Sequence, residues 1–239
     1  MINALRAGLF VFWFYGSMTI VGLIGMPFAI AAPRAGIVVA RIWSQVSLFG
    51  LRWICGVRIR IEGREHIPAD AAIVACKHQA QLDTILPFTL LKAPAFVLKR
   101  ELLDMPVFGF FAGRSGHIPL DREAHAAALK NLMRNARRAR DDKRQIVIFP
   151  EGTRQEPGAP PDYKVGVAAI YRDLGIPCVP VALDTGKVWP AWGYGIKPGV
   201  TTIRFLPPIP PGLSRDAFMA RLQSDIETAS DALWRGAPP

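Results

Sequence analysis

An uncharged segment near the N-terminus constrains this chain more than any other feature of its sequence. No charged residue lies between Arg6 and Arg34, and positions 9–15 read Leu-Phe-Val-Phe-Trp-Phe-Tyr. A helix that crosses a bilayer needs about 20 predominantly apolar residues, and residues 7–33 exceed that length. No later part of the chain is large enough to wrap so apolar a segment inside a soluble core. We therefore expect it to contact a membrane.

A second apolar segment, residues 35–57, has two arginines and two tryptophans, a composition typical of the membrane interface. Three arrangements remain open. The first is a transmembrane helix followed by an interfacial helix, and the second is a helical hairpin that dips into one leaflet and turns near Pro27 and Pro33. The third is a cleaved signal peptide, which the length of the apolar region disfavours. We expect residues 1–56 to be membrane-anchoring helices.

Charge and cysteine content narrow the class of protein further. The net charge of +10 favours a polyanionic partner, which means nucleic acid, an anionic membrane surface or a phosphorylated substrate. Cys55, Cys76 and Cys178 form no Cys-x-x-Cys pair, so they suggest neither a zinc site nor a disulfide framework. Three buried thiols in a reducing compartment would place the bulk of the chain on the cytoplasmic side of the membrane.

Residues 57–239 alternate between strand and helix patterns and predict one α/β domain, with a mostly parallel central sheet flanked by helices. The expected strands begin at Val57, Ala71, Ala95, Gln145, Cys178 and Thr201. Helices are expected over residues 123–140, 163–174 and 214–236, the last capped by Ser214 and ended by Gly236. The first of these has a strongly basic face, which is either solvated or docked on anionic lipid.

The sequence Lys-His-Gln-Ala-Gln-Leu-Asp at 77–83 follows a predicted strand and holds a candidate acid–base pair. On one continuous helix, His78 and Asp83 would lie about 140° apart. They can meet only if His78 lies in the turn before the helix and Asp83 lies in its first turns. An aspartate that accepts from one imidazole nitrogen leaves the other nitrogen able to take a proton from an alcohol.

A second motif, Phe-Pro-Glu-Gly-Thr-Arg at 149–154, follows another predicted strand. Glycine at 152 permits a close approach of the backbone, and the guanidinium of Arg154 offers a fork for a phosphate. Further cations without matching acids occur at Lys99, Arg122 and Lys164. They accompany an apolar stretch, residues 101–109, that could line an acyl groove. Together these features predict a phosphate pocket beside an apolar surface.

In order and spacing, four blocks resemble those of the glycerolipid acyltransferase family, which includes the PlsC-type 1-acylglycerol-3-phosphate acyltransferases. These blocks are His78 to Asp83, Lys99 to Arg122, the hexapeptide 149–154 and Val179-Pro-Val-Ala-Leu. The hexapeptide matches the family's third block without a change. Two positions depart from the usual pattern, since Lys77 replaces an asparagine and Ala80 replaces a serine. We expect Lys77 to add a cation near the site.

The resemblance implies transfer of a fatty acyl group from acyl-CoA or acyl-carrier-protein to the 2-hydroxyl of 1-acyl-sn-glycerol-3-phosphate, with His78 and Asp83 catalytic. Substrate contacts would come from Glu151, Gly152, Thr153, Arg154, Lys99, Arg122 and Lys164. It implies no metal and no cofactor beyond the acyl donor. The expected location is the inner (cytoplasmic) membrane, with membrane lipids and lysophosphatidic acid as partners and the catalytic domain facing the cytoplasm.

Other functions remain open on the sequence alone. The nearest is acylation of a different acceptor, such as a lyso-ornithine lipid or glycerol-3-phosphate. A lipid esterase would need a nucleophile in a suitable motif, and the sequence offers none. A catalytically dead membrane-binding protein explains the anchor but gives no use to His78, Asp83 and Glu151. We expect no nucleic-acid partner, because basic and aromatic residues are not interleaved as in nucleic-acid modules.

Overall fold

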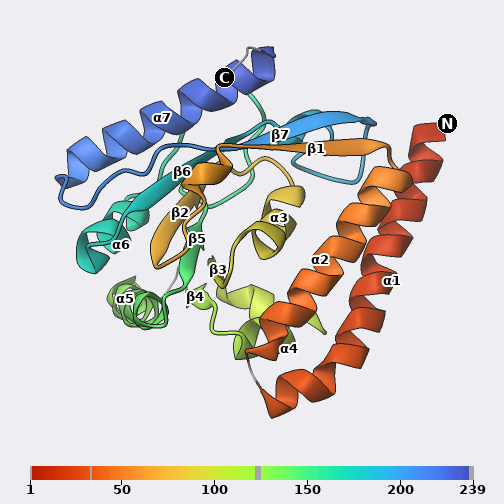
Figure 1. Ribbon diagram of the computed structural model, residues 1–239, viewed down its shortest axis with the longest axis horizontal. Coiled ribbons are helices and arrows are strands. Elements are labelled where there is room, and N and C mark those ends of the chain that lie inside the picture. The colour runs from red at the N-terminus through yellow and green to blue at the C-terminus, as the bar shows by residue number, and fades with distance from the viewer. Residues whose placement is uncertain (1, 33, 122–124, 237–239) are drawn as a thin grey trace.

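The computed structural model describes residues 2–32, 34–121 and 125–236, and within them seven strands form one sheet (Figure 1). The strand order is β1-β7-β6-β2-β5-β3-β4, and only β6 and β7 pair in antiparallel fashion. The strands are β1 (Val57–Glu62), β2 (Ala72–Cys76), β3 (Pro94–Lys99), β4 (Ile118–Leu120), β5 (Gln145–Ile148), β6 (Cys178–Leu183) and β7 (Gly199–Phe205). The predicted α/β class with a mostly parallel sheet is therefore confirmed.

Helices cover both faces of this sheet (Figure 1). On one face lie α1 (Ile2–Ala31), α2 (Ala35–Trp53), α3 (Leu82–Leu90) and the short α4 (Phe108–Arg114). On the other face lie α5 (His125–Asp141), α6 (Gly166–Leu174) and α7 (Arg215–Arg235). The result is a three-layer arrangement in which the sheet is buried between two helical layers.

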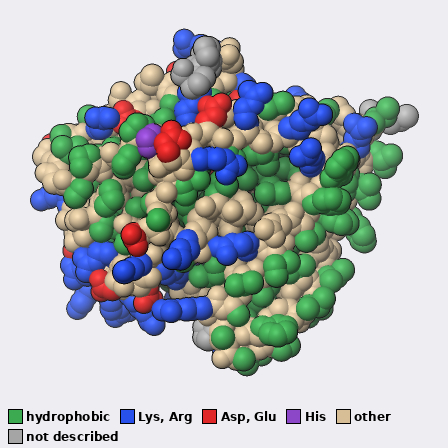
Figure 2. Space-filling model, in the orientation of Figure 1, with side chains coloured by type: hydrophobic (Ala, Val, Ile, Leu, Met, Phe, Trp, Pro, Cys, Tyr) green, Lys and Arg blue, Asp and Glu red, His purple; other side chains and the backbone are tan. Residues whose placement is uncertain are grey.

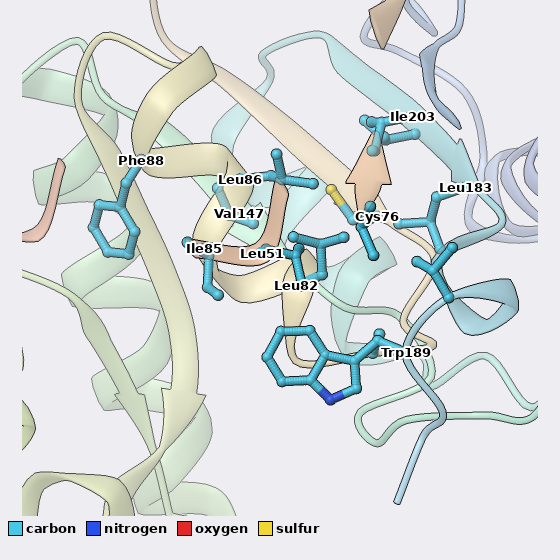
Figure 3. Close-up of a cluster of buried hydrophobic side chains, with 14 of the residues drawn as sticks. Leu51, Cys76, Leu82, Ile85, Leu86, Phe88, Val147, Leu183, Trp189 and Ile203 are labelled. Carbon is cyan, nitrogen blue, oxygen red and sulfur yellow. The ribbon is translucent and has the colours of Figure 1, made fainter. Parts of the chain in front are cut away.

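Alternation along β2 shows how the sheet separates two cores. Val74 and Cys76 pack with the helices of the α1–α3 layer, whereas Ile73 and Ala75 pack with those of the α5–α7 layer. Successive side chains of a strand point to opposite faces, so a continuous apolar run is required where both faces are buried. Figure 3 shows the first core, in which Trp189 lies beside Leu82 of α3.

The two N-terminal helices form an antiparallel hairpin that packs against the α/β layers (Figure 1). Phe10 and Phe14 of α1 are buried and contact the ring of Trp189. The guanidinium of Arg41 donates to the main-chain oxygens of Phe88, Leu91 and Lys92 at 2.8–2.9 Å. Arg41 thus satisfies carbonyls at the end of α3, where no helical donor remains.

The outer face of α1 exposes a row of large apolar side chains. Figure 2 shows this surface along the edge of the molecule where α1 lies. It comprises Leu5, Leu9, Phe12, Ile20, Leu23, Ile24 and Phe28. Among the described helices, α1 is the one long and apolar enough to cross a membrane, and little of it is buried. An exposed apolar surface of this extent indicates association with a membrane.

Several predicted element boundaries need correction. The helix expected from residue 163 begins at Gly166, because residues 155–164 form an extended loop whose end is tied by the bond from Lys164 N to Pro150 O. Strand β4 was not predicted, since it has three residues and contains Pro119. The start expected for the helix over residues 123–140 falls partly outside the described residues. The Ser214 cap, the Gly236 end and the three buried thiols are confirmed.

Candidate active site

The two motifs that the sequence singled out meet at one edge of the sheet. Strands β2 and β5 are parallel neighbours, so the residues that follow them, 77–81 and 149–154, leave the sheet side by side. Strand β3 is the next neighbour of β5 and ends at Lys99 on the same edge. The carboxyl edge of a parallel sheet is where open α/β folds place their binding sites.

His78 and Asp83 are in hydrogen-bond contact. His78 lies in the turn before α3, Asp83 is the second residue of that helix, and 3.0 Å separates His78 Nδ1 from Asp83 Oδ2. The predicted meeting of the two residues across the strand–turn–helix boundary is confirmed. With Nδ1 protonated and bound to the carboxylate, Nε2 is the ring nitrogen with a free lone pair.

The carboxylate of Asp83 is fully buried and fully satisfied. Its Oδ2 also accepts from the main-chain N–H groups of Gln79 and Ala80 at 2.6 and 2.8 Å. Its Oδ1 accepts from the hydroxyl of Thr185, at 2.6 Å. Four donors to one carboxylate fix its orientation. The imidazole is held on its other side by Phe149, whose ring stacks on it at 4.0 Å between centroids.

Glu151 occupies a different place from the one predicted. Its side chain has no exposed surface, and its Oε2 accepts from the main-chain N–H of His78 at 3.1 Å. Its Oε1 accepts from Lys77 Nζ at 2.7 Å. A carboxylate enclosed in this way holds the main chain of the His78 turn and has no surface exposed to the open site. Lys77 is likewise buried and paired with carboxylates, so it adds no cation to the open site.

The remaining residues of the hexapeptide line the open side. Gly152 has φ of +69°, a left-handed conformation that favours glycine at this turn. Thr153 is exposed. The guanidinium of Arg154 lies over the indole of Trp192, 4.8 Å from the ring centroid, and forms no salt bridge with any described residue. A stacked guanidinium keeps its N–H fork available for an anion.

The other predicted cations have less uniform surroundings. Lys99 is exposed at the end of β3 and forms no salt bridge within the part of the chain that the structure describes. Lys164 is also exposed, but its ammonium pairs with Asp162. Arg122 lies outside the described residues. The structure therefore brings His78, Asp83, Arg154 and Lys99 to one sheet edge, and it leaves Lys164 engaged with its own loop.

An apolar cavity of about 50 Å³ lies between the hairpin and α4. Its walls include Gly36, Val39 and Ala40 of α2, Val107 and Phe111 around α4, and the rings of Phe88 and His117. Phe88 and His117 both contact Phe96, which in turn contacts Phe149 beside His78. The predicted apolar stretch, residues 101–109, contributes Val107 and Phe108 to this cavity.

Some residues of the site could not be recognised in the sequence. Thr185 and Trp192 belong to the segment that follows β6, and Glu227 belongs to α7, whose apolar periodicity gave no reason to single out one acid. Glu227 bonds Lys77 across 150 residues of sequence. The one available signal was the unusual lysine at position 77, whose burial next to Glu151 requires a further acid nearby.

Comparisons with known proteins agree with this geometry. A family model described as Acyltransferase matches residues 58–184. A 1-acyl-sn-glycerol-3-phosphate acyltransferase of Pseudomonas aeruginosa is 30% identical over 161 residues, covering 67% of this chain and 63% of the relative. One of Cocos nucifera is 30% identical over 189 residues, covering 78% and 60%. The chain therefore spans about 60% of the length of these curated relatives.

The fold also has a counterpart among solved structures. The crystal structure of the 1-acyl-sn-glycerophosphate (LPA) acyltransferase PlsC from Thermotoga maritima superposes with a TM-score of 0.80. The alignment covers 97% of each chain at 21% sequence identity. This likeness extends over the N-terminal hairpin as well as the sheet and establishes a shared fold. Because the family model covers more than half of its residues, the chain belongs to the acyltransferase family.

Proposed function

We propose that this protein transfers a fatty acyl group from acyl-CoA or acyl-carrier-protein to the 2-hydroxyl of 1-acyl-sn-glycerol-3-phosphate, forming phosphatidic acid. The observation that carries the proposal is the His78–Asp83 pair, held at the sheet edge beside Arg154 in a chain of the acyltransferase family. The names of the relatives support this acceptor. Phosphatidic acid is a precursor of membrane phospholipids, which agrees with the apolar face of α1.

The proposed reaction is a direct transfer with His78 as general base. Nε2 takes the proton of the acceptor hydroxyl, and the oxygen attacks the thioester carbonyl. The tetrahedral intermediate then expels the thiolate. The imidazolium gives the proton it took from the hydroxyl to this thiolate, so the products are an ester and a free thiol. Asp83 stabilises the positive imidazolium throughout and keeps its orientation. The reaction consumes no cofactor and requires no metal.

We assign the acceptor phosphate to the cations at the mouth of the site. Arg154 is stacked on Trp192 and free of carboxylates, and exposed Lys99 lies at the same sheet edge. A dianionic phosphate gains most from a planar guanidinium, which binds it through two N–H groups. Arg122 remains a predicted third contact. Lys164 would have to leave Asp162 before it could contribute.

The cavity between the hairpin and α4 is the proposed site for part of an acyl chain. It is lined almost entirely by apolar side chains, and the contacts through Phe96 and Phe149 connect its wall to His78. Methylene groups gain about 0.8 kcal/mol each when they leave water for such surroundings. An acyl chain that enters beside the hairpin can thus remain partly in an apolar environment while its reacting end reaches the base.

The hairpin also determines how the protein would lie on the inner (cytoplasmic) membrane. Helix α2 packs against α3 and β1, and α1 packs against α2, so neither helix is free to cross a bilayer alone. The exposed face of α1 can enter one leaflet while the α/β layers stay in water. We infer that the catalytic part faces the cytoplasm, since its two cysteines, Cys76 and Cys178, are free thiols.

The decisive experiment is acyl transfer from labelled acyl-CoA to 1-acyl-sn-glycerol-3-phosphate in detergent micelles. Wild type is compared with His78→Ala and with the control His66→Ala, which alters a histidine that lies near Glu65, outside the candidate site. Phosphatidic acid from wild type and His66→Ala but not from His78→Ala is the expected result. Equal product from His78→Ala would rule out His78 as the base. Activity only with lyso-ornithine lipid or glycerol-3-phosphate would refute the acceptor and keep the reaction class.

A further inference from the structure

A buried group of ionisable side chains lies behind the His78 turn, on the side away from the proposed substrate. Lys77 Nζ contacts Glu151 Oε1 at 2.7 Å and both carboxylate oxygens of Glu227 at 2.7 and 2.8 Å. The hydroxyl of Tyr163 donates to Glu227 Oε1 at 2.8 Å. The four residues come from the end of β2, the loop after β5, the segment before α6 and the middle of α7. None of them is required by the acyl-transfer chemistry itself.

Burial removes most of these charged side chains from water, which costs free energy unless their charges are paired. The side chains of Lys77 and Glu151 are 5% and 0% exposed, and that of Glu227 is 23% exposed. One ammonium is shared by two carboxylates, so the removal of Lys77 would leave two neighbouring carboxylates without a cation. Burial raises the pKa of Glu151, the Lys77 ammonium opposes that rise, and Glu227 adds to it. Burial also raises the pKa of Tyr163, which keeps its hydroxyl protonated as a donor.

The group acts on His78 through Glu151. One carboxylate oxygen of Glu151 is held by Lys77, and the other accepts from the main-chain N–H of His78. Asp83 accepts from the next two main-chain N–H groups, those of Gln79 and Ala80. The turn that presents the imidazole is therefore fixed at both of its ends by carboxylates. Only the Asp83 end is secured by the catalytic pair itself.

We propose that Lys77, Glu227 and Tyr163 are positioning residues that lock Glu151 against the His78 backbone and so tie the C-terminal helix α7 to the reaction centre. The inference rests on the proposed acyl transfer with His78 as base. A displacement of about 1 Å in a reacting group can cost on the order of 100-fold in rate. Loss of the lock therefore lowers kcat, while KM changes little because none of the three residues contacts substrate.

The pH dependence of kcat reports the charge of this group beside the His78 turn. The charged or titratable groups facing Glu151 are Lys77, Glu227 and Tyr163, with His78 and Asp83 on the other side of the turn. Lys77→Met makes this region one unit more negative, so the acid limb of the kcat profile moves to higher pH. Glu227→Gln makes it one unit less negative, so the limb moves to lower pH. Tyr163→Phe changes no charge, so it should leave the limb in place although it lowers kcat.

The experiment compares five variants with wild type. Lys77→Met is expected to lower kcat about 100-fold with KM within about threefold. Glu227→Gln and Tyr163→Phe preserve shape and lower kcat less. The double variant Lys77→Met with Glu227→Gln should recover part of the loss, because the repulsion between two carboxylates is removed. Arg204→Met breaks a part-buried pair with Glu62 far from the turn and should lower thermal stability without changing kcat.

A second measurement needs no substrate. Hydrogen exchange at the His78 amide should accelerate in Lys77→Met and Glu227→Gln but not in Arg204→Met, since only the first two loosen Glu151. Unchanged kcat, unshifted pH limbs and unchanged exchange would overturn the inference whatever the melting temperature does. If wild type makes no phosphatidic acid, the proposed function fails and exchange alone decides the inference. If Lys77→Met does not fold, Glu227→Gln and Tyr163→Phe carry the same test.

Discussion

At the scale of single residues, the site depends on carboxylates that have no contact with solvent. Asp83 accepts four hydrogen bonds, three of them from the turn that carries His78. Its negative charge is the feature that a neutral amide cannot reproduce. An asparagine at this position can keep an oxygen toward His78 Nδ1 and retain the tautomer, yet it cannot stabilise the imidazolium that forms during transfer.

We therefore expect Asp83→Asn to lower kcat by about 100- to 10,000-fold, the range of a general-base contribution. Thr185→Val removes only the bond to Oδ1 and should cost about tenfold, since a hydrogen bond to a charged group contributes about 1.5–3 kcal/mol. Both variants are assayed by steady-state acyl transfer. If Asp83→Asn were as active as Thr185→Val, the charge of Asp83 would not contribute to the reaction.

Arg154→Lys tests the assignment of the acceptor phosphate. Lysine keeps the charge but loses the planar fork and most of the stacking on Trp192. We expect KM for 1-acyl-sn-glycerol-3-phosphate to rise about tenfold, with a smaller change in kcat. Arg221→Lys, which alters an exposed pair on α7, serves as the matched control. An unchanged KM in Arg154→Lys would show that another cation binds the phosphate.

Sequence reasoning succeeded for residues joined by short spacing and failed for those joined across the chain. His78 and Asp83 could be predicted to meet because a turn and a helix start link them locally. Glu151 was predicted to face the substrate, and it is instead enclosed because Glu227 and Lys77 arrive from distant elements. The partners of a buried charge are decided by tertiary packing, which local patterns do not encode.

At the scale of elements, the cavity between the hairpin and α4 joins segments that are not adjacent in sequence. Ala40 of α2 lines it, whereas Val38 of the same helix is exposed. Ala40→Leu reduces the volume for an acyl chain, so we expect activity with long-chain substrates to fall more than activity with short-chain ones. Val38→Leu is the control and should leave the preference unchanged. Competition assays with mixed chain lengths measure the ratio.

His117, which lines the same cavity, should make the free energy of unfolding depend on pH. Burial and the nearby Arg144 guanidinium lower its pKa to about 3, and its Nδ1 accepts from the main-chain N–H of Phe96. The unfolded state, with a pKa of about 6.5, binds more protons between these values, so stability falls as pH decreases through this range. The slope from this group is about 1.4 kcal/mol per pH unit. His117→Gln should reduce the slope in denaturant unfolding between pH 6 and 4, and an unchanged slope would contradict this.

Elements were predicted well where periodicity and caps were strong. The continuous apolar runs of β2, β5 and β6 follow from burial on both faces of a parallel sheet. The start of α7 follows from the cap at Ser214, and its end follows from Gly236. The three-residue strand β4 was not predicted, because its pairing with β3 depends on tertiary position. The start of α6 at Gly166 was not predicted, because the preceding loop is fixed by a main-chain bond with Pro150.

At the scale of the whole molecule, the hairpin and the α/β layers form one body. The sequence separated residues 1–56 from residues 57–239, and the structure shows that both parts contribute to one core. Phe10, Phe14 and Leu51 pack with Trp189 and the sheet. This shared core fixes the position of the site relative to the apolar face of α1.

That geometry predicts which surface binds the membrane. Ile20 and Ile24 are exposed and lie one turn apart on α1. Burying an apolar side chain of this size contributes about 1.5–3 kcal/mol, so the double variant Ile20→Lys with Ile24→Lys should weaken vesicle binding by about 100-fold or more. Val200→Lys with Leu213→Lys adds the same charge on exposed apolar positions outside the hairpin and should bind as wild type does. Co-sedimentation with anionic vesicles measures both. Equal binding of the two double variants would exclude the face of α1 as the membrane surface, and loss of binding only in the second would place that surface around β7 and the start of α7.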